Sequence, residues 1–196
     1  MEKVHKTCLE MLNQRGYIIT ENTDEKLVGK RIESKIESKI ESKIESKIES
    51  KIESKIESKK KDKKICVILS NISKFNVDRV EECISFMNSI NVKHAIVIYS
   101  DTATSTAKTM IEKLDDMKIE LFGIDELQHN ITKHKLCPEH IKLEQEEAEK
   151  FKKEYSLKFP TILKNDPISR FYGYQRGDVI KVIRKNGFIT YRIVRG

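Results

Sequence analysis

The sequence predicts an α/β protein, α+β overall, with two domains. A small N-terminal α/β sandwich with parallel-type βαβ units occupies residues 1–124, and a compact C-terminal domain of short helices and a β-hairpin occupies residues 125–196. Three observations predict this fold class. Apolar strand-like runs alternate with amphipathic helical segments up to residue 124, this alternation stops after it, and an Asn-Gly pair separates two alternating stretches near the end. A length of 196 residues suits two modest domains.

The first 64 residues predict a short helix, an extended stretch and a repeat. Apolar residues over Lys3–Leu12 have helical spacing and end before Gly16, and Tyr17–Thr20 reads as extended. From residue 32 to 59 the unit Ile-Glu-Ser-Lys occurs seven times without a change. As a helix it would place like charges four residues apart. We therefore predict a low-complexity linker with fluctuating helix, and an ordered solvated helix is the alternative.

The next segment has the order expected for two βαβ units. Short apolar runs predict buried strands, and apolar residues three and four apart predict the helices between them. Such an order implies a parallel sheet with right-handed connections. The predicted elements are a strand over Ile65–Ser70, a helix over Val77–Ile90, a strand over His94–Tyr99, a helix over Ser105–Met117 and a strand over Lys118–Ile124.

The C-terminal segment begins with a predicted loop over His129–Lys142 and a helix over Glu144–Tyr155, whose acidic start and basic end suit the helix dipole. Asp166 and Pro167 predict the start of a short helix, and Gly173 predicts its end. Alternating apolar residues then flank Asn186-Gly187, which predicts a β-hairpin with a type I′ turn.

Composition narrows the class of protein. The longest apolar runs are far too short to cross a bilayer, and no apolar signal segment opens the chain, so we expect a soluble protein that is not secreted by that route. The four cysteines stand alone, which favours reduced thiols. From residue 156 onwards there are nine Lys or Arg and two acids, so this tail carries the whole net charge of +7. That favours an acidic or polyanionic partner, although basic surfaces also simply keep a domain soluble.

Metal and catalytic sites are weakly supported. The zinc-ligand types His129, His134, Cys137 and His140 lie near one another, but a second half-site is missing, and we prefer a loop with Leu136 and Pro138 packed inward. No glycine-rich phosphate loop or nucleophile elbow occurs. A nuclease would need scattered carboxylates to hold Mg²⁺, such as Asp101, Asp115, Asp116 and Glu120. We therefore expect no catalytic residues, no metal and no cofactor.

The C-terminal residues resemble a known family. The run from Phe159-Pro160 through Asp166-Pro167 to the stretch Gly173–Lys185, followed by Tyr191-Arg192, is similar to the signature of the fifth-subunit family of DNA-dependent RNA polymerases, which spans the eukaryotic and the archaeal enzymes. Residues 130–140 resemble the segment that joins the two domains of that family. Met11–Thr20 resembles its first helix and turn, whereas residues 21–64 match nothing in it.

This resemblance implies an architectural function. It implies a non-catalytic polymerase subunit in a hetero-oligomer, whose C-terminal domain docks on the largest polymerase subunit and whose N-terminal, jaw-like domain lies near downstream DNA. No membrane is involved. The expected location is the nucleus for a cellular protein, and the host cytoplasm (viral factory) or the virion for a copy from a large DNA virus. An independent basic nucleic-acid-binding regulator is the alternative function.

Candidate assembly residues follow from the corners and the basic hairpin. Rigid corners aim neighbouring side chains, and exposed cations pair with acidic groups of a partner. The same residues could equally serve only to build their own turns. The hairpin departs from the family, whose members carry a longer loop at residues 186–187. The assembly candidates are Asp166, Pro167, Arg176, Gly177, Asp178, Arg184 and Arg192.

Overall fold

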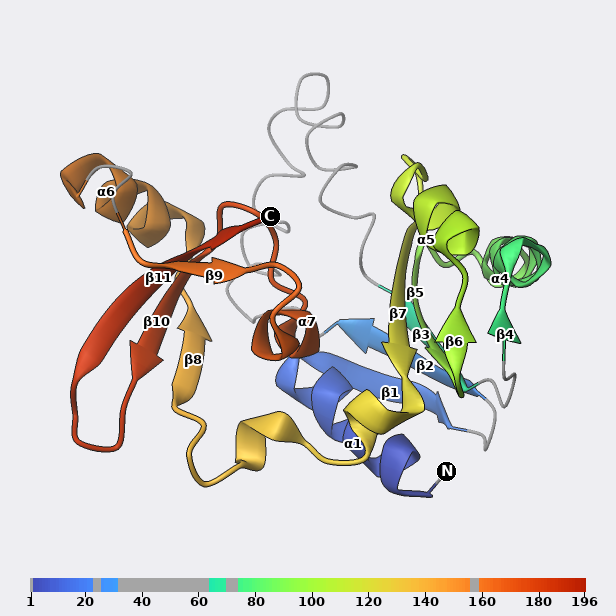
Figure 1. Ribbon diagram of the computed structural model, residues 1–196, viewed down its shortest axis with the longest axis horizontal. Helices are drawn as coiled ribbons and strands as arrows, with labels where there is room; N and C mark the ends of the chain where they lie inside the picture. The colour runs from blue at the N-terminus through green and yellow to red at the C-terminus, as the bar shows by residue number, and fades with distance from the viewer. Residues whose placement is uncertain (1, 23–25, 32–63, 70–73, 156–158) are drawn as a thin grey trace, which may run out of the picture. The chain divides into compact units, whose positions relative to one another are not determined.

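A computed structural model of the chain confirms the mixed α/β class (Figure 1). It describes residues 2–22, 26–31, 64–69, 74–155 and 159–196. The predicted Ile-Glu-Ser-Lys linker, residues 32–59, lies outside the described residues. The chain divides into two compact units, Met1–His129 and Asn130–Gly196, each described below by itself. Within the described residues, no helix has the length and the apolar character needed to cross a membrane.

The N-terminal unit is built on a five-stranded mixed sheet. Its parallel part consists of β3 (Lys64–Leu69), β5 (His94–Tyr99) and β7 (Lys118–Gly123), which confirms the three predicted strands. Two antiparallel strands, β1 (Tyr17–Asn22) and β2 (Lys26–Arg31), extend it in the order β1-β2-β3-β5-β7. Strand β2 was not predicted from the sequence. Two short strands, β4 (Lys74–Phe75) and β6 (Thr102–Ala103), pair separately.

The helices of this unit begin at local caps. In α4 (Val77–Ser89) the Asn76 side chain accepts a hydrogen bond from the backbone N–H of Arg79, and in α5 (Ser105–Glu112) Thr104 accepts one from Ala107. The predicted end of α5 at Met117 is wrong, because the helix stops at Glu112. Two aspartates follow at positions 115 and 116, and the negative end of a helix dipole disfavours carboxylates.

Both faces of the five-stranded sheet are covered. Alternate side chains of β3, β5 and β7, such as Cys66, Ala95 and Ile119, form one core with α4 and α5. On the other face, α1 (Glu2–Gln14) buries Val4, Cys8, Met11 and Leu12. A short 3₁₀ helix, η1 (Ile124–Leu127), contacts α1. The unit is therefore a sheet between two helical layers, as predicted.

The C-terminal unit contains a four-stranded sheet in the order β8-β10-β11-β9. The strands are β8 (Glu139–Lys142), β9 (Thr161–Leu163), β10 (Val179–Ile183) and β11 (Ile189–Arg195), and only the β9–β11 pair is parallel. The β10–β11 hairpin confirms a prediction. The loop predicted over His129–Lys142 is wrong at its end, because residues 139–142 pair with β10, and β9 was not predicted.

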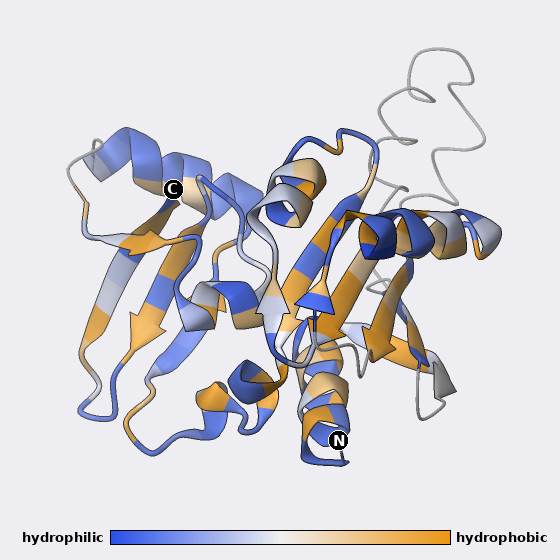
Figure 2. Cartoon of the chain, turned by 45° about the vertical axis from the view of Figure 1, so that its right-hand side comes forward, coloured by the Kyte–Doolittle hydropathy of each residue, from blue (hydrophilic) through white to orange (hydrophobic). Residues whose placement is uncertain are grey.

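Two short cores lie on opposite faces of this sheet. On one face, Ile180, Val182, Val194 and Ile162 pack with Tyr172 and Tyr174, at the end of the short helix α7 (Pro167–Tyr172). On the other face, Val179 and Ile193 pack under α6 (Gln145–Tyr155). The Phe151 ring of α6 lies 4.5 Å from the Tyr191 ring and 4.7 Å from that of Phe159. Figure 2 shows orange segments in β9, β10 and β11, and α6 mostly in blue.

The hairpin turn differs from the predicted type I′ turn. That turn needs positive φ at both Asn186 and Gly187, but only Gly187 has it, at 80°. The Gly187 N–H donates to the Arg184 carbonyl at 2.8 Å, and the Arg184 N–H donates to the Phe188 carbonyl at 3.0 Å. The connection is therefore a three-residue loop with glycine in the left-handed position. Asn186 instead uses its side-chain oxygen to accept a bond from the Phe188 N–H.

Candidate functional site

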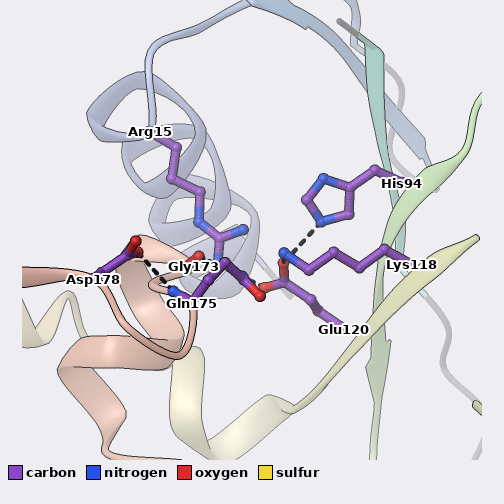
Figure 3. Close-up of polar contacts among 7 residues, drawn as sticks. All are labelled: Arg15, His94, Lys118, Glu120, Gly173, Gln175 and Asp178. Carbon is purple, nitrogen blue, oxygen red and sulfur yellow. Dashed lines mark hydrogen bonds and ion pairs between the residues drawn. The ribbon is translucent and has the colours of Figure 1, made fainter. Parts of the chain in front are cut away.

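The predicted corner at Arg176-Gly177-Asp178 is held by hydrogen bonds. Gly177 has φ +90°, and its N–H donates to the Val194 carbonyl at 2.9 Å. The Asp178 carboxylate accepts from the backbone N–H of Gln175 at 2.8 Å and pairs with Lys142 Nζ at 2.8 Å. The Gln175 side chain donates to the Gly173 carbonyl at 2.8 Å (Figure 3). Gly177 and Asp178 thus stabilise the fold of their own unit, while Arg176 is exposed on the corner.

The predicted corner at Asp166-Pro167 starts α7. Asp166 Oδ1 accepts from the Ile168 N–H at 2.9 Å, and Pro167 occupies the first turn, where no N–H is needed. Gly173 ends the helix in the left-handed conformation, with φ 70°. Between these two ends the helix buries Ile168 and Phe171. Both helix boundaries were predictable because the signals that make them are local.

Arg192 lies near Asp166 and His140. It is half-buried on β11, in register with Ile180 of β10. The pKa of the half-buried His140 is lowered, mainly by burial and also by the positive charge of Arg192. A hydrogen bond with the Pro138 carbonyl and the negative charge of Asp166 act in the opposite direction. Two of the predicted assembly residues, Arg192 and Asp166, therefore both lie close enough to the His140 imidazole to change its pKa.

Arg184 lies apart from these residues. It is exposed where β10 meets the hairpin turn, whereas Asp178 precedes the opposite end of β10. The seven predicted residues thus occupy three places in the unit and do not form one compact site. These places are the corner at 176–178, the α7 start with Arg192, and the hairpin end.

The hairpin end carries apolar side chains that the sequence analysis did not select. Leu136 is 82% exposed, Phe188 60%, Ile189 43% and Ile141 41%. The expectation that Leu136 packs inward is wrong. In its tight turn the Leu136 N–H donates to His134 Nδ1 at 3.2 Å and the Cys137 N–H to the His134 carbonyl at 2.9 Å, which leaves the leucine side chain directed outward. The sequence did contain a signal for these exposed apolar side chains, because Phe188-Ile189 directly follows the basic residues of the turn.

Three of the four possible zinc ligands make local contacts. His134 Nδ1 accepts the Leu136 N–H, His140 Nδ1 lies 2.8 Å from the Pro138 carbonyl, and the Cys137 thiol donates to that same carbonyl at 3.4 Å. Within the described ranges, no group of three or more His, Cys, Asp or Glu side chains is placed to hold a metal ion.

The N-terminal unit contains a partly buried charge cluster around Glu120. Its carboxylate pairs with Arg15 Nη2 at 2.8 Å, His94 Nε2 at 2.7 Å and Lys118 Nζ at 2.9 Å (Figure 3). Burial acts to raise the pKa of Glu120, but the hydrogen bond with His94 and the charges of Arg15, His94 and Lys118 outweigh it and hold the pKa well below 4.5.

The remaining carboxylates of the possible nuclease site, Asp101, Asp115 and Asp116, are exposed. The cations around Glu120 already satisfy its negative charge, so this carboxylate is not available to a magnesium ion. The cluster instead joins the end of α1, through Arg15, to β5 and β7.

Comparisons with known proteins find similarity to subunits of RNA polymerases. The family described as RNA polymerase Rpb5, C-terminal domain, matches residues 129–194. The chain is 30% identical over 205 residues to subunit rpabc1 of DNA-directed RNA polymerases I, II and III from Dictyostelium discoideum, covering 97% of this chain and 95% of that protein. The corresponding subunit of Caenorhabditis elegans is 27% identical over 98% of this chain and 94% of its own length.

A viral protein is also similar. The putative DNA-directed RNA polymerase subunit 454R of Invertebrate iridescent virus 6 is 41% identical over 119 residues. That match covers 55% of this chain and 65% of the viral protein, so it spans less than two thirds of either.

Proposed function

The chain belongs to the RNA polymerase Rpb5 family, and from this premise we propose that it is a non-catalytic subunit of a DNA-directed RNA polymerase, docking on the largest subunit through its C-terminal unit. The single observation that carries the proposal is the 30% identity to the Dictyostelium subunit, because it extends over 97% of the chain instead of one motif. As a member of this family, the chain has other polymerase subunits as partners.

The C-terminal unit supports the docking role by its construction. Its corners at residues 166–167 and 176–178 are fixed by caps and by backbone hydrogen bonds, so they need little ordering when a partner binds. The side chains of Arg176 and Arg184 are exposed, and their guanidinium groups make no hydrogen bond or ion pair with the described residues. We propose that these two cations, with Arg192, meet carboxylates of the largest subunit. Asp166, Pro167, Gly177 and Asp178 hold the backbone that presents them.

The N-terminal unit is proposed to support downstream DNA during transcription. Helices cover both faces of its sheet, and the ion pairs around Glu120 join α1 to β5 and β7, which suits a part that stays fixed beside a moving duplex. Residues 32–63, which include the Ile-Glu-Ser-Lys repeat, interrupt this unit between β2 and β3.

Reconstitution tests the docking role. The full chain is mixed with the largest polymerase subunit, and complex formation is measured by size-exclusion chromatography and equilibrium binding. We expect a stable complex, and expect Arg176→Glu with Arg184→Glu to weaken it by about tenfold, since two rim charges are reversed. Lys164→Glu, an exposed basic position on the other edge of the sheet, is the matched control. Recovery of only the free chain would contradict the proposal.

Nucleic-acid binding by the isolated chain separates the alternative from the main proposal. An independent regulator with the basic tail would bind duplex DNA with an affinity that falls steeply with salt. We expect weak binding by the chain alone and protein–DNA crosslinks from the N-terminal unit only within the assembled polymerase. Tight binding by the isolated chain would favour the regulator.

Its location should follow the polymerase that contains it. We propose the nucleus for a cellular polymerase, and the cytoplasmic viral factory or the virion for a viral one. Imaging a tagged chain together with the largest subunit would test this, and separate locations for the two proteins would contradict it.

A further inference from the structure

One face of the C-terminal sheet is only partly covered by α6. Under the helix, Val179 and Ile193 are buried with Ala148, and Tyr191 and Phe151 pack against them. Strand register carries the same face further toward the hairpin. Lys181 pairs with Tyr191, and Ile183 pairs with Ile189. Because alternate residues of a strand share a face, Ile183 and Ile189 lie on the face that α6 covers at its other end.

The edge strand β8 adds a third isoleucine to this face. Ile141 pairs with Lys181, so it lies beside Ile183 on the same side of the sheet. We call Ile141, Ile183 and Ile189 the isoleucine patch. Ile141 is 41% exposed and Ile189 43%, and Ile183 is half-buried. In Figure 2 the strands remain orange close to the blue hairpin turn. The apolar rows of the sheet thus continue where the covering helix has ended.

The charges around the patch are mainly positive. Lys181 lies between Ile141 and Tyr191 on the same face, and Arg184 and Lys185 are exposed at the adjoining turn. One acidic residue, Glu139, pairs with Ile183 at the end of β8. An occupant should therefore bring apolar side chains for the isoleucines and carboxylates for the lysines.

From this combination we propose that the isoleucine patch is a docking surface for an apolar segment with flanking carboxylates on another polymerase subunit. The inference rests on the proposed function and adds to it the position and the chemistry of the contact. Two other occupants fit less well. A second copy of the chain would bring Lys181 and Lys185 against like charges, and nucleic acid would leave the exposed isoleucines facing phosphates.

The test uses the full chain and, as the probe, the polymerase assembled without it. Ile189→Asp places a charge in the patch, and we expect at least about tenfold weaker binding, as for residues central to an interface. Leu163→Asp is the matched control, because Leu163 is 62% exposed but lies on β9, the opposite edge strand. The control should bind within about twofold of the unaltered chain.

A second variant keeps the test independent of folding. Lys181→Glu with Lys185→Glu leaves the isoleucines in place, and circular dichroism checks that both variants fold. We expect about tenfold weaker binding at low salt and a smaller loss at high salt, since the lost attraction is electrostatic. If Ile189→Asp does not fold, the charge-reversed variant decides the outcome by the same criterion.

The outcomes separate this inference from the proposed function. Failure of the unaltered chain to bind the polymerase would overturn both. Normal binding by the unaltered chain and by folded patch variants would overturn the isoleucine patch and leave the polymerase role standing. A dimer of the isolated chain that Ile189→Asp abolishes would assign the patch to a second copy, and would also overturn the inference.

Discussion

The sheets of the two units differ in how completely helices cover their faces. The N-terminal unit has helices on both faces of its sheet and encloses even the charges of Glu120 and Arg15. The C-terminal unit has two small cores and leaves the hairpin end of one face open. Among the exposed large apolar side chains of the described residues, Ile18 alone belongs to the N-terminal unit. Among the described residues, the C-terminal unit therefore exposes more large apolar side chains than the N-terminal unit.

Thiol reactivity should show the largest difference between the units. Burial and, to a smaller extent, the neighbouring Cys83 raise the pKa of Cys66 to about 12. Burial also raises the pKa of Cys137 in the C-terminal unit, but this thiol is only partly buried. Because the thiolate is the reactive form, we expect Cys66 to react with iodoacetamide at pH 8 at least about a hundredfold more slowly than Cys137. Mass spectrometry of timed samples measures both rates. The two thiols should react at equal rates in urea. Equal rates of Cys66 and Cys137 in the native chain would contradict this prediction.

The charge cluster of the N-terminal unit predicts the largest mutational effect. Glu120→Gln removes the carboxylate that faces Arg15 and His94, and we expect a loss of about 3 kcal/mol in the free energy of unfolding of this unit. Urea-dependent labelling of Cys66 reports that unit selectively. Glu112→Gln, at an exposed site on α5, is the control and should change little. An equal loss of unfolding free energy in Glu120→Gln and Glu112→Gln would contradict the stabilising role of the charge cluster.

The same carboxylate predicts an acid dependence. Its folded pKa lies below 4.5, so its contribution to stability is fully present above about pH 4.5 and is lost as the pH falls toward the folded value. We expect the stability of the N-terminal unit to fall over this range, and to fall less in Glu120→Gln. Parallel acid titrations of the two proteins, followed by circular dichroism, make the comparison.

In the C-terminal unit, the corner residue Gly177 should contribute to stability through its backbone conformation. Gly177 has φ +90°, so Gly177→Ala should cost about 1–2 kcal/mol through the strained backbone. Gly123→Ala is the control in the other unit, because Gly123 has φ −72° and an added Cβ would meet atoms no closer than 3.6 Å. Hydrogen exchange of the β10 amides measures the effect. Unchanged protection in Gly177→Ala would contradict it.

The smallest expected effect concerns the start of α7. Asp166→Ala removes the oxygen that accepts the Ile168 N–H and should cost about 1 kcal/mol. Asp166→Asn retains a side-chain oxygen that can cap the helix, so it should keep most of the stability while losing the charge. Urea unfolding of both proteins distinguishes capping from charge. Equal losses in the two would show that the charge beside Arg192 matters more than the cap.

Local signals explain which predictions were correct. The start and end of α7 depend on Asp166, Pro167 and Gly173, and the hairpin depends on a glycine between two alternating runs, so their neighbours in sequence suffice. β2, β8 and β9 lack such signals. Each is a short segment that pairs with a strand distant in sequence, and β2 also pairs with its neighbour β1.

The sequence by itself determined the alternating βαβ order, the caps and corners, and the resemblance that led to the polymerase family, because these are properties of adjacent residues. Only the tertiary structure decided that Glu120 is enclosed by Arg15, His94 and Lys118, and that Ile141 joins Ile183 and Ile189 on one face. Burial and charge pairing depend on residues far apart in the chain, and the fold alone brings them together.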